Sequence, residues 1–223
     1  DVAMRLLDII RSIEESAVPL RPYIAWEERE LMKQANASAE RFSKGKPLGI
    51  LDGVPVSVKD ELDMLPFKTM IGTRFYSNQP PEQDATSVAR LRSAGALMVG
   101  KTNMHEIGLG VTGLNIHYGT TRNPHHLDHY PGGSSSGSAA AVAAGLSPIA
   151  LGCDGGGSIR IPASLCGVVG LKTTWGRIST AGSAPLHWSI GSVGPITSTA
   201  SDAAIAYSFL AGPDKRQSCT LEP

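Results

Sequence analysis

The sequence predicts an α/β fold built on a mainly parallel sheet. Short apolar segments rich in β-branched residues alternate along the chain with segments of helical spacing, the order expected of strand–helix–strand crossovers. Of the 223 residues, 41% are hydrophobic and 18% are charged. This composition provides apolar material for one sizeable core and too few charges for a disordered chain, so we expect one globular unit.

Charge and cysteine content exclude several classes of protein. The 20 basic and 20 acidic residues cancel, so no net field favours nucleic acid or an anionic membrane, and a small, largely uncharged ligand fits better. No apolar run approaches the roughly 20 residues that span a bilayer, and no signal peptide precedes the first helix. Cys153, Cys166 and Cys219 show no CxxC spacing, which favours a reducing compartment and buried, inert thiols.

The first third of the chain is predicted to form two helices and a strand. Apolar residues recur at helical spacing over 2–15, and Pro19 ends that helix. A more polar helix is expected over 25–42, with its charged side chains in solvent. Residues 49–59 are rich in β-branched residues and predict a strand that ends at Lys59.

A strand–helix–strand crossover is expected to follow. Asp84 is the expected N-cap of a helix that Gly95 ends. Residues 96–99 predict a short buried strand, and residues 103–109 a further helical turn. Because such crossovers are right-handed and join parallel strands, we expect the two strands to run parallel in one sheet.

The second half continues the alternation. The alanine-rich segment 136–144 predicts a helix that stops at Gly145. Residues 147–153 predict a strand, and residues 161–169 a helix with proline in its first turn. A last amphipathic helix is expected over 201–211.

Two turns rich in glycine and serine, 132–137 and 155–160, carry the candidate chemistry. Glycine lets a backbone bend sharply or approach a bound group closely, and serine supplies a hydroxyl that can become a nucleophile. Because both turns belong to one supersecondary unit, we interpret them as parts of one site rather than as linkers.

Three familiar patterns are rejected on context. Residues 95–102 fit the phosphate-loop pattern GxxxxGK[ST], but the apolar strand lies inside the motif instead of preceding it. Residues 133–137 fit the GxSxG nucleophile elbow, but loop-like residues precede them. Three histidines and an aspartate over 125–129 have no zinc-ligand spacing, so we expect a solvated loop there and no metal.

A serine nucleophile without a histidine base needs another proton acceptor. Lys59 follows an apolar strand, where burial favours the neutral, basic form of a lysine. A lone lysine is more often exposed at its tip, so this role depends on the rest of the pattern.

The pattern as a whole resembles the amidase signature family. The segments that carry the resemblance are, in the family's order, 53–60, 100–104, 132–137 and 154–163. The resemblance runs from about residue 48 to residue 212. It implies an α/β amidase signature fold with a central mixed, largely parallel sheet flanked by helices, and an amidohydrolase activity. Because the family's catalytic domain continues further, we expect only its N-terminal half here.

The resemblance implies a Ser-Ser-Lys triad. Lys59 is the expected base, Ser134 the bridging serine beside a cis peptide bond, and Ser158 the nucleophile that accepts the acyl group. Neutral Lys59 takes a proton from Ser134, which takes one from Ser158, and the reverse path protonates the departing amine. The expected intermediate is an acyl ester of Ser158.

The second turn is expected to stabilise negative charge. Its expected oxyanion donors are consecutive backbone N–H groups, those of Gly155, Gly156, Gly157 and Ser158. Such donors contribute roughly 3 kcal/mol each. Asp154 and Arg160 are expected to brace the turn rather than react. No cofactor is expected.

Within the family, the segments 119–124, 129–130 and 164–172 look most like plant-type fatty acid amide hydrolases, which cleave N-acylethanolamines. Two alternatives stay open. One is a general amidase or the glutaminase subunit of a tRNA-dependent amidotransferase. The other is a catalytically silent truncated chain that acts by binding.

These interpretations divide the chain into an N-terminal helical segment (1–47), a partial catalytic core (48–212) and an unstructured tail (213–223). The expected partner is a small amide, of lipid character, with no nucleic acid. We expect an intracellular location. Attachment to the endoplasmic reticulum or plasma membrane through segments outside this sequence, and a homodimer, stay open.

Overall fold

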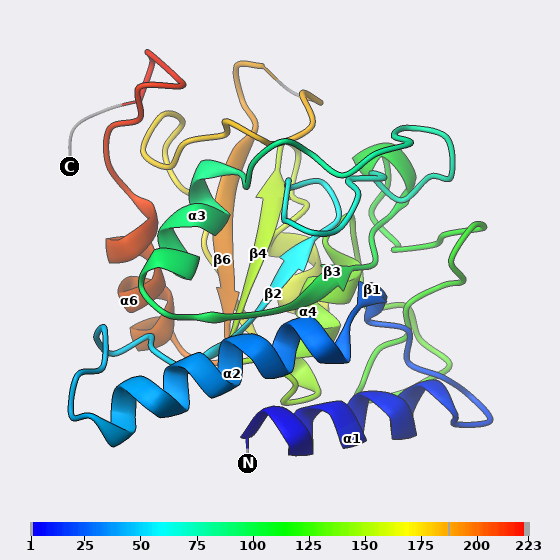
Figure 1. Cartoon of the computed structure of the whole chain (residues 1–223). Helices are drawn as coiled ribbons and strands as arrows, with labels where there is room; N and C mark the ends of the chain where they lie inside the picture. Colours follow the sequence, from blue (N-terminus) through cyan, green and yellow to red (C-terminus); the bar gives the residue numbers. More distant parts are fainter. Residues whose placement is uncertain (1, 187, 221–223) are drawn as a thin grey trace.

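A six-stranded mixed sheet forms the centre of the computed structural model, which describes residues 2–186 and 188–220 (Figure 1). The strands are β1 (Tyr23–Trp26), β2 (Pro55–Lys59), β3 (Leu97–Thr102), β4 (Ile149–Asp154), β5 (Val169–Gly170) and β6 (Ser192–Thr197), in the order β1-β3-β2-β4-β6-β5. The central strands β3, β2 and β4 run parallel, whereas β1, β6 and β5 each pair antiparallel with a neighbour. The predicted α/β class with a mixed sheet is confirmed, and its parallel part is the centre.

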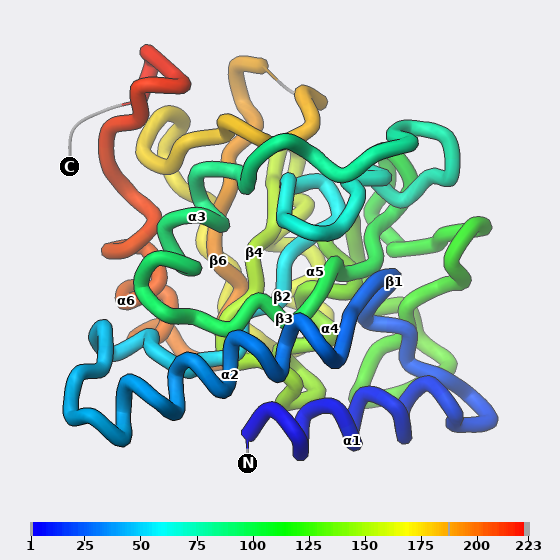
Figure 2. Tube along the Cα trace, in the orientation of Figure 1, coloured from blue at the N-terminus to red at the C-terminus, as the bar shows by residue number. Residues whose placement is uncertain are grey.

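Helices cover both faces of the sheet. They are α1 (Val2–Glu14), α2 (Glu28–Ser43), α3 (Thr86–Ser93), α4 (Ser136–Ala143), α5 (Arg160–Leu165) and α6 (Ala200–Leu210), with a 3₁₀ turn at Glu106–Gly108. Helices α3 and α6 lie side by side on one face, where Leu91 and Leu210 share a core with Val56 (Figure 2). Helices α1, α2 and α4 pack on the other face around Leu97. None of the described helices has the length and apolar character of a membrane span.

Strand alternation decides which side chains of β2 face which layer. Val56 is buried in the core under α3 and α6. Ser57 faces the opposite layer, where its Oγ lies 2.7 Å from the hydroxyl of Tyr23 and 2.7 Å from Oγ of Ser147. Because successive side chains of a strand point to opposite faces, Lys59 lies on the same side as Ser57. The strand therefore directs Lys59 toward the layer that holds α4.

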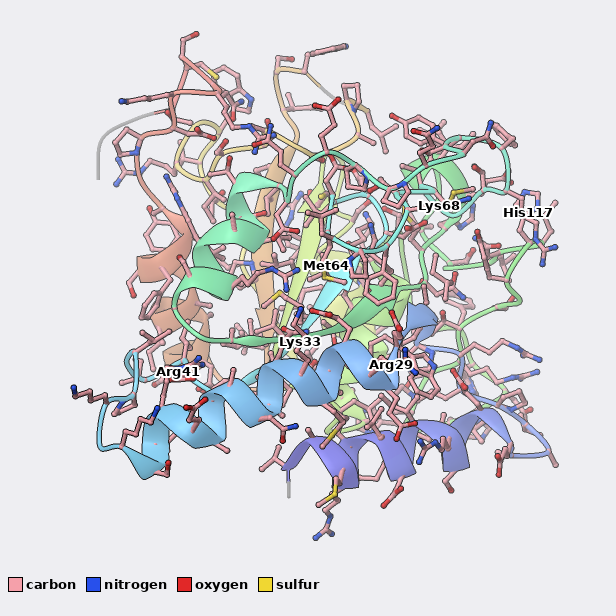
Figure 3. The ribbon with its side chains drawn as sticks, in the orientation of Figure 1. Arg29, Lys33, Arg41, Met64, Lys68 and His117 are labelled. Atoms are coloured by element: carbon pink, nitrogen blue, oxygen red, sulfur yellow. The ribbon has the colours of Figure 1, made fainter. Side chains whose placement is uncertain are left out.

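The second helix begins later than predicted. The helix expected over 25–42 begins at Glu28, because β1 pairs with β3 as an edge strand and takes up the preceding residues. As predicted, most of its charged residues face outward, but Arg41 pairs with the buried carboxylate of Asp52 at 2.5 Å. Arg29 and Lys33 project from the exposed side of α2 (Figure 3).

Both strands of the crossover differ from their predicted bounds. The strand expected over 49–59 begins at Pro55, because the residues before it form turns. The strand expected over 96–99 continues to Thr102, because β3 pairs with β1 on one side and with β2 on the other. Parallel pairing of β2 with β3 confirms the crossover itself.

Two helical predictions in the first half are corrected. Asp84 is not the N-cap of α3, because Ala85 holds that position and the Asp84 carboxylate pairs instead with Arg92 at 2.7 Å. The helical turn expected over 103–109 is only the three-residue 3₁₀ turn Glu106–Gly108.

In the second half, α4 and α6 form close to their predicted positions. The helix expected over 161–169 ends at Leu165, because Gly167 adopts φ +66° and the next residues pair with β6 as β5. Sequence pattern does not predict β6, because Gly194 and Pro195 interrupt its apolar run.

The described residues that follow α6 contact the rest of the protein. The Asp214 carboxylate accepts hydrogen bonds from Thr86 Oγ1 at 2.6 Å and from Ser179 Oγ at 2.5 Å. These contacts tie part of the segment expected to be an unstructured tail (213–223) to α3 and to the loop before β6. Residues 221–223 lie outside the described part.

The N-terminus of α4 lies very close to the backbone beside β1 and β3. The N–H of Gly137 donates to the carbonyl of Asn103, just beyond β3, at 2.9 Å. A Cβ at Gly137 would lie 2.2 Å from the Pro22 carbonyl oxygen and 2.5 Å from the Asn103 nitrogen. Only glycine allows α4 to sit this close.

We predict that Gly137→Ala lowers the free energy of unfolding by about 1–3 kcal/mol or more, because the backbone atoms around the added methyl cannot move aside cheaply. Urea unfolding midpoints measure the effect. Gly156→Ala is the matched control, because a Cβ there meets no atom within 4 Å. Equal midpoints for the two variants would contradict this description of the α4 contact.

Candidate active site

The structure brings Lys59 and Ser134 into contact. Lys59 is the last residue of β2, and its side chain is 1% exposed. Its Nζ lies 2.8 Å from Ser134 Oγ and 3.3 Å from the carbonyl oxygen of Cys153, the penultimate residue of β4. The expected base and the expected bridging serine are therefore hydrogen-bonded, although 75 residues separate them in sequence.

Ser134 lies in the turn that leads into α4. Its peptide bond with Gly133 is cis, as the family resemblance implies. The Ser134 side chain is buried, and its carbonyl accepts a hydrogen bond from the N–H of His105 at 3.1 Å. A Cβ at Gly133 would lie 2.8 Å from the Gly113 nitrogen, so this turn is closely packed against a neighbouring loop.

Ser158 and Ser134 line the same cavity, which has a volume of about 280 Å³ and lies where β4 ends and β6 begins. Ser158 is half-buried. Its carbonyl accepts a hydrogen bond from the N–H of Ser135 at 3.1 Å, so the two Gly/Ser turns are joined directly. The apolar wall of the cavity includes Ala181, Ala184, Pro185, Leu186, Trp188 and Val193.

Asp154 braces the second turn. Its two carboxylate oxygens accept hydrogen bonds from the N–H groups of Gly157 at 2.8 Å and Ile159 at 3.0 Å. Arg160 pairs with both oxygens, at 3.1 Å and 3.0 Å. Burial alone would raise the pKa of Asp154, but the guanidinium and the N–H donors outweigh it and lower that pKa to about 2. A carboxylate held this way stays ionised and fixes the turn.

One expected oxyanion donor is already used. The N–H of Gly157 points to the Asp154 carboxylate, so it is not available to an oxyanion. Within the described residues, the N–H groups of Gly155, Gly156 and Ser158 have no protein acceptor. The expected role of the Gly157 N–H as an oxyanion donor is therefore corrected, because this group braces the turn instead.

Sequence reasoning missed Glu61. One of its carboxylate oxygens lies 2.8 Å from Lys59 Nζ, and the Glu61 side chain is 7% exposed. The neighbouring Asp60 points elsewhere and accepts a hydrogen bond from the N–H of Gly72 at 2.9 Å. Strand alternation does not predict this contact, because residues 60 and 61 lie in the turn after β2, and the fold of that turn brings residue 61 rather than residue 60 to Lys59.

Sequence reasoning also missed Lys172. Its ammonium donates hydrogen bonds to the backbone carbonyls of Asp154 and Ile190. Burial lowers the pKa of Lys172, while the Asp154 carboxylate opposes that change. Lys172 thereby ties the end of β4 to the loop before β6, and no local sequence pattern indicates this contact.

The structure agrees with the rejection of the phosphate-loop motif. Lys101 lies within β3 and is fully buried. Its ammonium donates to the Leu62 carbonyl at 2.5 Å and to Thr69 Oγ1 at 3.2 Å, and it lies 3.5 Å from Asp60. Burial lowers the pKa of Lys101 and raises that of Asp60. Lys101 therefore fastens the chain after β2 and presents no charge to a phosphate.

The other two rejected motifs also have ordinary structural explanations. Turns and loop residues precede Gly133, so no strand enters the GxSxG pattern. In the histidine-rich loop, His125 Nε2 lies 2.9 Å from the Cys166 carbonyl, and the rings of His126 and His129 pack edge to face. Across the described residues, no group of three or more potential ligands is arranged to hold a metal ion.

The amino-acid sequence of this chain is similar to those of known amidases. The Amidase family profile matches residues 7–223. A fatty acid amide hydrolase of Arabidopsis thaliana is 46% identical over 223 residues, which cover 100% of this chain and 37% of that protein. The A-type subunit of the glutamyl-tRNA(Gln) amidotransferase from Syntrophobacter fumaroxidans is 47% identical over 195 residues, 86% of this chain and 40% of that protein.

Solved structures show the same likeness. The native peptide amidase from Stenotrophomonas maltophilia superposes with a TM-score of 0.91 at 36% identity, covering 96% of this chain and 45% of that one. The chain thus spans less than half the length of each of these three proteins.

We predict that Asp154→Asn destabilises the protein at neutral pH by an amount that shrinks as the pH falls. A carboxylate with a lowered pKa contributes stability above its unfolded pKa, about 3.9. That contribution is lost as the pH falls through the folded pKa of about 2. Urea midpoints of wild type and variant at pH 7, 4 and 2.5 measure it. Asp8→Asn, at a side chain that is 75% exposed, is the control. A difference independent of pH would contradict the prediction.

Proposed function

The chain belongs to the amidase family, and on that premise we propose that it hydrolyses amide bonds through an acyl ester of Ser158, with Ser134 and Lys59 as its proton relay. The observation that carries the proposal is the 2.8 Å contact between Lys59 Nζ and Ser134 Oγ beside a cavity that Ser158 also lines. A serine hydroxyl becomes a useful nucleophile only when a base can take its proton, and this relay provides one.

In the proposed reaction, Ser158 Oγ attacks the amide carbonyl and passes its proton to Ser134, which passes its own to Lys59. When the tetrahedral intermediate collapses, the carbon–nitrogen bond breaks and the protons return along the same path to the leaving amine. Water then attacks the ester of Ser158, with Ser134 and Lys59 again accepting and returning a proton. The carboxylic acid leaves, and the free serine is restored.

The oxyanion would be held by the three N–H groups that have no acceptor within residues 2–186 and 188–220, those of Gly155, Gly156 and Ser158. Asp154 supports this role because it fixes the turn through Gly157 and Ile159 and leaves the other donors unoccupied. Preorganised donors of this kind are worth roughly 3 kcal/mol each in the transition state.

For the substrate, we propose fatty acid amides such as N-acylethanolamines. Two observations support this choice: the Arabidopsis thaliana relative named fatty acid amide hydrolase matches the chain end to end, and apolar residues such as Leu186, Trp188 and Val193 form part of the cavity wall beside its polar residues. Glutamine hydrolysis, as in the A-type component of an amidotransferase, is the second candidate, because one such protein is 47% identical. A general amidase and a silent chain that acts by binding are the remaining alternatives.

A substrate panel separates these candidates. Release of ethanolamine from an N-acylethanolamine, ammonia from glutamine and the amine from a short aryl amide should be measured at equal concentrations. The proposal expects the highest kcat/KM for the N-acylethanolamine. A preference for glutamine would support the amidotransferase alternative and contradict the lipid substrate.

We predict that Lys59→Ala lowers kcat for an amide by about 10²–10⁴-fold and lowers it less for the ester with the same acyl group. An amine can depart only after it receives a proton from the relay. An alkoxide or phenolate is a better leaving group and depends less on such a proton. Paired amide and ester assays measure the difference. Lys68→Ala, at an exposed lysine, is the control and should leave both rates unchanged. Equal losses on the two substrates would argue against Lys59 as acid and base.

We also predict that a fluorophosphonate probe labels the wild-type protein and fails to label Ser158→Ala. The reason is that only a serine activated by the relay attacks phosphorus at a useful rate. Intact-mass measurement detects the adduct, and Ser183→Ala, another serine that lines the cavity, should still be labelled. A folded wild-type protein that takes up no probe would favour the silent-chain alternative.

A further inference from the structure

Three acceptors from three parts of the chain surround the amine of Lys59. They are Ser134 Oγ at 2.8 Å, the Cys153 carbonyl oxygen at 3.3 Å and a carboxylate oxygen of Glu61 at 2.8 Å. The amine and the carboxylate are nearly inaccessible to solvent, with side chains 1% and 7% exposed. Water therefore does not compete for these positions, and the protein alone decides where the N–H groups of Lys59 point.

The number of hydrogen-bonding positions on the nitrogen limits the arrangement. A neutral amine has two N–H donors and one lone pair, and an ammonium has three N–H donors. A carbonyl oxygen and an ionised carboxylate can only accept. The Cys153 carbonyl and Glu61 therefore take up two N–H groups in either state. The third position faces Ser134, as a lone pair when Lys59 is neutral and as an N–H when it is charged.

We propose that Glu61 is a positioning residue for the hydrolysis: its carboxylate, together with the Cys153 carbonyl, holds Lys59 so that the amine exchanges its proton only with Ser134. The relay is then supported by a fourth side chain, Glu61, which also lines the cavity but takes no part in the proton transfers. This inference rests on the proposed function, because it assigns a role within that reaction.

Backbone contacts fix the position of Glu61 itself. The Glu61 carbonyl accepts a hydrogen bond from the N–H of Ala184 at 2.9 Å, and Leu62 pairs with Ser183 as an isolated β-bridge. The carboxylate is thus attached to a segment that is paired with the cavity wall, rather than to a free loop. Because the Glu61 backbone is held in this way, its carboxylate can keep the Lys59 amine within the short distance of Ser134 that proton transfer requires.

The test combines two Glu61 variants with Lys59→Ala, using an amide and an ester of one acyl chain. Glu61→Leu removes the acceptor, and Glu61→Gln keeps an oxygen that can accept without the charge. We expect Glu61→Leu to lower kcat for the amide by about 10- to 100-fold with KM nearly unchanged, because misplacing a reacting group by about 1 Å has effects of this size. Glu61→Gln should lie between Glu61→Leu and wild type.

A double variant that combines Lys59→Ala with Glu61→Leu distinguishes a positioning role of Glu61 from a merely structural one. In the Lys59→Ala background, Glu61→Leu should cause no further loss, because the group that it positions is gone. Glu106→Gln is the control, since Glu106 pairs with His117 and not with Lys59, and should keep the wild-type kcat. Urea midpoints establish that each variant is folded before rates are compared.

Three outcomes would overturn the proposal: wild-type kcat in both Glu61 variants, a loss that resides in KM, or an equal loss with and without Lys59. In each of these outcomes the proposed function stands if Lys59→Ala alone lowers kcat for the amide by about 10²–10⁴-fold. If Lys59→Ala leaves amide hydrolysis intact, or if the wild type cleaves no amide, the proposed function fails and the role of Glu61 fails with it.

Discussion

A lysine amine buried at the carboxyl end of a central strand must find its hydrogen-bond acceptors inside the protein, because an unpaired polar group in that position is costly. Lys59 meets this requirement with acceptors from β4, from the turn before α4 and from Glu61. Those three segments can meet only if β2 and β4 pair in parallel and α4 begins directly above their ends. Satisfying one buried amine thus fixes the relative position of the elements that make up the site.

A buried carboxylate organises the other half of the site in the same way. Asp154 ends β4 and gathers the N–H groups of the following turn and the guanidinium of Arg160. The parallel centre of the sheet therefore places a buried lysine amine at the end of one strand and a buried carboxylate at the end of its neighbour. The cavity that both candidate serines line opens between these two fixed points.

Sequence pattern predicted the parts of this arrangement that are local. The alternation of β2, the alanine-rich α4 and the two Gly/Ser turns are all visible in consecutive residues, and the family resemblance adds the relation between Lys59 and Ser134. Sequence pattern did not predict β6, because glycine and proline are unusual inside a strand that pairs on both sides, as β6 does with β4 and β5. Nor did it predict the use of the Gly157 N–H by Asp154 or the pairing of Glu61 with Lys59, since both depend on how turns fold back in three dimensions.

The central claim is that the two Gly/Ser turns act as one site in which Ser158 carries the acyl group. The most direct measurement is rapid quenching of the protein during turnover of an activated ester of a fatty acid, followed by proteolysis and mass spectrometry of the peptides. We predict one added acyl group on the peptide that contains Ser158. An acyl group on the peptide that contains Ser134, Ser135 and Ser136 would contradict it, because those serines would then supply the nucleophile and not the relay.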